Sequence, residues 1–116
     1  MARVYVGCAG WAIPRSLAPR FPGPGTHLER YARVLNATEI DSSFYREHRS
    51  ETYARWAAAV PAGFRFSVKV PREITHVRKL AGVGPLVRGF LAGPRALGRK
   101  LGPLLVQLPP GLAFDA

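Results

Sequence analysis

The sequence predicts an α/β fold built on a parallel β-sheet. Short apolar runs rich in β-forming residues alternate with helix-like stretches, and each run stops at small, charged or amide side chains. Because parallel sheets carry their chemistry at the carboxyl ends of the strands, these polar ends also predict where a site would lie. The four expected strands are residues 4–8, 37–41, 64–70 and 104–108.

The first half of the chain is expected to hold two strands and two helices. Residues 4–8 are β-formers that give way to small residues, and a connection rich in proline and glycine follows over 14–25. A helix over 26–35 opens on a threonine cap and repeats its apolar residues at helical spacing. The strand at 37–41 is then followed by a helix over 50–60, which begins at a serine cap.

The second half is expected to repeat this order. Residues 64–70 alternate apolar and polar side chains with a period of two, which is typical of a strand. A loop over 71–76 follows, and a helical stretch over 85–101 should be kinked or split at Pro94. Residues 104–108 form the last expected strand, so the order of elements is that of βα units.

The alternation assigns four polar side chains to the sheet face opposite the helices. These residues are Glu39, Asp41, Lys69 and Gln107. In an open doubly wound sheet both faces are covered, and burying these groups would be costly. In a closed barrel they would point into the mouth. The sequence therefore favours half of a TIM (β/α)8-type barrel, with four parallel strands and helices on the outer face, over a small open sheet.

Composition limits the functional classes. The 116 residues suffice for one domain, and 47% of them are hydrophobic. A net charge of +10, from 17 Lys and Arg against 7 Asp and Glu, favours an anionic small molecule or nucleic acid as partner. No apolar stretch approaches the ~20 residues needed to cross a bilayer. Since no secretory signal is recognised and Cys8 is the only cysteine, a cytoplasmic location without membrane contact is expected.

Five short motifs in order along the chain resemble the YecE-like family, known as domain of unknown function 72. They are Gly-Cys-Ala-Gly-Trp at 7–11, Glu-Ile-Asp-Ser-Ser-Phe-Tyr at 39–45, Phe-Ser-Val-Lys at 66–69, Ile-Thr-His at 74–76 and Gln-Leu-Pro-Pro at 107–110. The resemblance implies a TIM barrel roughly twice as long as this chain, within the usual size of such barrels. Residues 1–116 would then be the N-terminal half of a YecE-like TIM-barrel domain, truncated after the fourth strand. The family usually has asparagine where Asp41 stands.

The polar strand ends supply the candidate site. Glu39, Lys69 and His76 are the expected catalytic residues, since a carboxylate, a lysine and a histidine can transfer protons or stabilise charge. No cofactor is identified. Two nearby carboxylates could attract a metal, but the usual histidine spacing of metal sites is absent, so no metal ligands are assigned. The expected substrate-binding residues are Trp11, Asp41, Ser43, Tyr45, Arg72 and Gln107.

Each assignment has a structural alternative. Glu39 and Lys69 could form an ion pair inside the barrel, and His76 could hold its loop by hydrogen bonds. The expected function is that of a barrel enzyme acting on an anionic or phosphorylated, nucleotide-like substrate, in a family whose reaction is not established. The alternatives are a basic nucleic-acid-binding module without catalysis, and an inactive truncated fragment whose uncovered sheet face leads to self-association.

Overall fold

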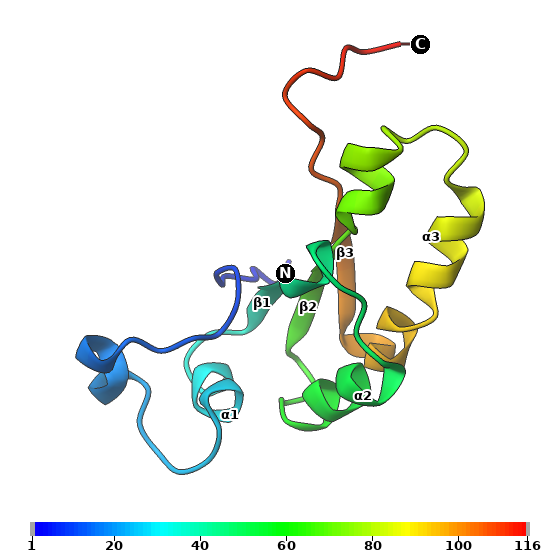
Figure 1. The fold of residues 1–116 in the computed structure, drawn as a ribbon. Coiled ribbons are helices and arrows are strands. Elements are labelled where there is room, and N and C mark those ends of the chain that lie inside the picture. The colour runs from blue at the N-terminus through cyan, green and yellow to red at the C-terminus, as the bar shows by residue number, and fades with distance from the viewer. Residues whose placement is uncertain (1, 116) are drawn as a thin grey trace.

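The computed structural model describes residues 2–115 and contains a three-stranded parallel sheet flanked by helices (Figure 1). The strands lie in the order β1 (Ala37–Ile40), β2 (Arg65–Lys69) and β3 (Leu101–Leu105). The α-helices are α1 (His27–Ala32), α2 (Ser50–Ala58) and α3 (Gly84–Leu91). The shorter helices are the 3-10 helices η1 (Arg15–Arg20), η2 (Ser42–Phe44) and η4 (Pro94–Lys100), and the π-helix η3 (Glu73–Val77).

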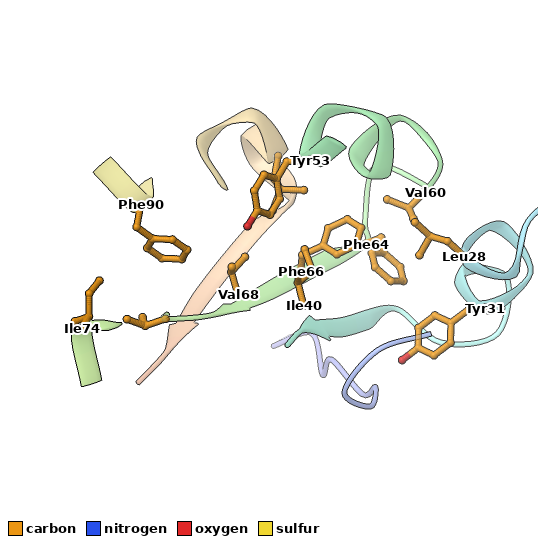
Figure 2. Packing of buried hydrophobic residues seen from close by; sticks show 12 residues of the cluster. Leu28, Tyr31, Ile40, Tyr53, Val60, Phe64, Phe66, Val68, Ile74 and Phe90 are labelled. Atoms are coloured by element: carbon orange, nitrogen blue, oxygen red, sulfur yellow. The ribbon is translucent and has the colours of Figure 1, made fainter. Parts of the chain in front are cut away.

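The alternation predicted for β2 is confirmed and separates the two faces of the sheet. Phe66 and Val68 are completely buried, whereas Ser67 and Lys69 on the other face are half-buried. Figure 2 shows the buried side chains packed in the layer between the strands and the helices. The helices thus cover one face of the sheet, and the face that carries Glu39 and Lys69 is left open.

The prediction of a strand at residues 4–8 is wrong. This segment runs beside β1, but it makes only one isolated bridge, between Ala9 and Glu39. Side chains take the place of a continuous backbone ladder. The Asn36 amide accepts from the Val6 N–H at 2.8 Å and donates to the Val4 carbonyl at 2.9 Å. The described residues therefore form three strands in place of the expected four.

The last strand lies three residues earlier than predicted, at 101–105 in place of 104–108. β2 ends at Lys69, and the last bond of the ladder runs from the Val70 N–H to the Leu105 carbonyl at 2.9 Å. Beyond that point the chain has no neighbouring strand to pair with. Pro103 is tolerated within β3 because this strand lies at the edge of the sheet.

The helices follow the sequence signals except at the start of α2, where the predicted serine cap is wrong. Ser50 is the first residue of α2, the N-cap position is Arg49, and no side chain caps this end. Thr26 caps α1 through a capping box with Glu29, in which each residue's backbone N–H is bound by the other's side chain. The stretch expected over 85–101 is split into α3 and η4 just before Pro94, as predicted. The expected loop at 71–76 instead contains the π-helix η3. Within residues 2–115, no helix has the length and apolar character needed to cross a membrane.

Tyr53 makes stability depend on pH in the alkaline range. Burial among the core side chains, with a smaller effect of Glu47, raises the pKa of Tyr53 to about 12. An unfolded tyrosine titrates near pH ~10. The neutral phenol is thus favoured in the folded state, so its stabilisation is complete below pH ~10 and is lost as the pH rises towards about 12. Urea unfolding of a Tyr53→Phe variant should show a smaller loss of stability over this range than the native chain. Equal losses in both proteins would contradict this account.

Candidate functional site at the carboxyl ends of the strands

Glu39 lies next to the carboxyl end of β1, on the open face of the sheet. One of its carboxylate oxygens, Oε1, is buried and has no hydrogen-bond partner. The side chain borders two hollows, one of about 700 Å³ over the open face and one of about 310 Å³ at the end of β1. Because a buried oxygen without a donor is costly, this carboxylate is suited to a ligand or a further protein group.

Lys69 is the last residue of β2 and is held by the turn that follows β1. Its Nζ lies over the ring of Phe44, 4.3 Å from the ring centroid, in a cation–π contact. The Ser43 hydroxyl reaches the carbonyl of Lys69 at 2.7 Å and that of Ile40 at 3.1 Å. Since the Ser43 side chain is only 1% exposed, it fastens η2 to the ends of two strands and is not accessible to a substrate.

Phe44 gathers three of the predicted site residues. Besides Lys69, the rings of Tyr45 and His76 meet it edge to face, with centroids 5.0 Å and 5.1 Å away. His76 also hydrogen-bonds through Nδ1 to the Thr75 hydroxyl at 2.7 Å, which fixes its ring. Phe44 itself is not among the predicted site residues. Its place within the 39–45 motif is the one signal that pointed to the site.

Tyr45 and Arg72 lie at the outer side of this cluster. Tyr45 is 78% exposed, and Arg72 is exposed at the start of η3. Both border a hollow of about 300 Å³. Arg46, Glu47 and Glu73 border the same hollow, so its lining carries charges of both signs. The aromatic ring and the guanidinium are suited to contact a planar group there.

The ion pair between Glu39 and Lys69, the structural alternative to a catalytic role, is not formed. In the part of the chain that the structure describes, the one salt bridge joins Arg78 to Glu73 at 3.3 Å, on the surface. The positive charge of Lys69 is therefore not neutralised by a carboxylate within the described residues. It stays available to an anion at the carboxyl end of β2.

The remaining predicted residues lie outside the Phe44 cluster. Trp11 packs edge to face against Trp56 and borders the 310 Å³ hollow together with Asp41, which is exposed. Gln107 is exposed and lies two residues beyond β3. Among residues 2–115, no three His, Cys, Asp or Glu side chains gather as a metal site would require.

One polar pair was missed by the sequence reasoning. The Ser42 hydroxyl oxygen lies 2.7 Å from Nε2 of His48. Neither residue is among the predicted site residues. The six-residue separation of these two residues is no recognised motif, so no signal in the sequence marked them as a pair.

The fold and the site define an α/β protein with polar and aromatic side chains gathered at the carboxyl edge of a parallel sheet. A family model described as "Protein of unknown function DUF72" matches residues 5–116, so the chain belongs to that family. This confirms the resemblance inferred from the five motifs.

Curated relatives and a solved structure of the same family are also similar to this chain. Over 106 residues the chain is 31% identical to "UPF0759 protein YecE" of Escherichia coli K12, covering 91% of the chain and 38% of that relative. "UPF0759 protein YunF" of Bacillus subtilis 168 is 28% identical over 113 residues, 92% of the chain and 40% of that relative. The chain thus spans about two fifths of the length of the curated relatives it matches. A crystal structure of a DUF72 family protein from Enterococcus faecalis V583 superposes with a TM-score of 0.68 at 25% identity, covering 96% of this chain and 41% of that one.

Proposed function

We propose that the chain is the N-terminal half of a TIM-type barrel domain. A parallel order of strands with helices on one face is the arrangement of such barrels. The open face, with Glu39 and Lys69 half-buried on it, would be the inner wall of the barrel. Relatives more than twice as long as this chain leave room for the remaining βα units.

The function that this arrangement favours is a barrel enzyme for an anionic or phosphorylated, nucleotide-like substrate. The convergence of Lys69, His76 and Tyr45 on Phe44, at the carboxyl end of β2, carries the proposal. Enzymes of this fold bind their substrates at this end of the strands. A lysine without a carboxylate partner attracts phosphate, and an exposed tyrosine beside it can stack on a base.

The residues divide into roles by position. Lys69 and Arg72 would hold the anionic group, and Tyr45 and Trp11 would contact a ring. Glu39 would transfer a proton or pair with a cationic group on the substrate, because its buried oxygen lacks a donor. His76, held by Thr75, would assist in proton transfer.

The test is calorimetric titration of the chain with pyrophosphate and with ADP at low salt. A Lys69→Met variant keeps the aliphatic contact with Phe44 and loses the charge. It should bind about tenfold more weakly, equivalent to ~1.4 kcal/mol. Arg88→Met removes an equal charge from the exposed surface of α3 and should leave the affinity nearly unchanged. Equal losses in the two variants, or no binding by the native chain, would contradict the proposal.

A second candidate, nucleic-acid binding, is favoured by one observation. The chain has a net charge of +10, and its one salt bridge among residues 2–115 pairs a single arginine. Most of the basic charge is therefore free to meet phosphates. Steeply salt-dependent binding of duplex DNA that survives Lys69→Met would favour this candidate over the enzyme.

Self-association is the third proposal for this chain. Apolar side chains are exposed along β3 and along the N-terminal segment, at the two edges of the open face, among them Val4, Val6, Leu104 and Leu105. Uncovered edges of this kind favour pairing between chains. Sedimentation velocity that shows only monomers at high protein concentration would exclude it.

A further inference from the structure

Ser42 and His48 stand in the geometry of a nucleophile and its base. The Ser42 hydroxyl oxygen is 2.7 Å from Nε2 of the His48 ring, a short hydrogen bond for this pair of groups. Both residues lie in the connection between β1 and α2: Ser42 opens η2, and His48 comes shortly before α2. The turn of η2 brings the hydroxyl back towards the histidine.

The His48 ring is held in place by aromatic neighbours. The rings of Trp56 and Tyr53, both on α2, meet it edge to face at centroid distances of 5.2 Å and 5.8 Å. Burial of the imidazole lowers the pKa of His48, and the nearby Arg46 lowers it further. The ring is therefore neutral at neutral pH and can accept a proton from the serine. The rings of Trp56 and Tyr53 fix the orientation of the His48 ring. In a catalytic triad a carboxylate orients the histidine.

The neighbouring Ser43, and not Ser42, makes the side-chain bonds that fasten η2 to the strands. Ser43 is buried, and its hydroxyl satisfies the carbonyls at the ends of two strands. Ser42 is exposed and borders the 310 Å³ hollow, whose apolar walls include Trp11 and Trp56. A hydrogen bond between accessible groups adds little to stability, since water can replace either partner. The hollow beside Ser42 has room for a small acyl group.

We propose that Ser42 and His48 form a nucleophile–base dyad that hydrolyses small carboxylic esters by acyl transfer. The Ser42 oxygen attacks the ester carbonyl carbon, and its proton passes to His48 Nε2. The bond to the leaving alcohol breaks, the alcohol takes that proton, and an acyl ester remains on Ser42. Water then attacks this ester and gives its proton to His48, which returns it to the serine oxygen as the carboxylic acid leaves.

This activity is separate from the proposed binding of anions at Lys69. It uses neither Lys69 nor His76. Outside the connection between β1 and α2 it needs only the rings of Tyr53 and Trp56 that hold His48 and the walls of the hollow, which include Trp11 and Glu39. A Lys69→Met variant should therefore keep it, and the two proposals can fail independently.

The test treats the full chain with a fluorophosphonate and with p-nitrophenyl acetate. Peptide mass spectrometry should find the phosphonyl group on Ser42, and Ser42→Ala should abolish both labelling and ester cleavage. Ser50→Ala removes another exposed serine, the first residue of α2, and should change neither. His48→Gln should slow labelling about a hundredfold, as expected for loss of a general base. No label on Ser42, or equal labelling after His48→Gln, would overturn the proposal.

A second variant keeps the proposal testable if His48→Gln does not fold. Ser42→Cys, made in a Cys8→Ser background because Cys8 is exposed, puts a thiol beside the imidazole. Alkylation by iodoacetamide should be at least ~10-fold faster than for a Ser50→Cys control, because a nearby base promotes thiolate formation. Equal rates at the two positions would overturn the dyad.

Discussion

Replacing Phe66 with alanine should lower the free energy of unfolding by about 3–5 kcal/mol, the usual cost of truncating a buried aromatic residue. Phe66 is completely buried and lies in β2. Its ring contacts those of Phe64 and Trp11, at centroid distances of 5.0 Å and 6.3 Å. Truncation to alanine leaves a cavity among these rings, and the lost contacts and the cavity together account for the cost.

Urea denaturation followed by circular dichroism measures this loss. Val106→Ala is the matched control, because Val106 is half exposed beyond β3 and its truncation should cost less than ~1 kcal/mol. If Phe66→Ala is unfolded under all conditions, Phe66→Leu should still fold, with a smaller loss in the free energy of unfolding. Similar losses for Phe66→Ala and Val106→Ala would show that β2 is not the centre of the core.

Gly7→Ala should be the most damaging of the glycine substitutions, costing about 2–3 kcal/mol through overlap of atoms. A side-chain carbon at this position would overlap the carbonyl group of Ala37 and press on the Tyr31 hydroxyl. That hydroxyl accepts from the Cys8 N–H at 3.0 Å and donates to the Ala37 carbonyl at 2.7 Å. The N-terminal segment can only relieve the overlap by moving away from β1, which breaks these bonds.

Gly89→Ala is the control for this prediction. Gly89 lies in α3, and an added carbon there meets open space. The substitution should raise stability by about 0.5–1 kcal/mol, because alanine favours the helix. Thermal unfolding of both variants measures these two opposite changes in stability. A Gly7→Ala variant as stable as the native chain would mean that the N-terminal segment does not lie against β1.

The alternating pattern of β2, the threonine cap of α1 and the break at Pro94 could all be predicted, because each depends on residues close in sequence. Whether residues 4–8 form a strand could not be predicted from residues close in sequence. These residues favour a strand, but their backbone groups are bound by the side chains of Asn36 and Tyr31, which only the tertiary structure brings there. The position of β3 was also predicted wrongly. Its carboxyl end is set by pairing with β2, which ends at Lys69, and the local sequence does not show this limit.

The site was predicted in part. Alternation placed Glu39 and Lys69 on the open face correctly, but it could not show that they do not pair. The contacts of Phe44 with Lys69 and His76, and the pairing of Ser42 with His48, depend on the path of η2 after β1. That path results from Ser43 binding the carbonyl of Lys69, a contact across 26 residues that no local pattern encodes.

The proposal that the carboxyl edge of the sheet binds an anionic, nucleotide-like substrate is tested most directly by mapping where ADP binds. Backbone amide shifts of the isotopically labelled chain would be followed during a titration with ADP. We expect the largest changes at residues 41–45 and 69–76, around the Phe44 ring, and we expect them to be lost in Lys69→Met. Changes confined to the outer surfaces of α2 and α3, or an unaltered pattern in Lys69→Met, would contradict the account.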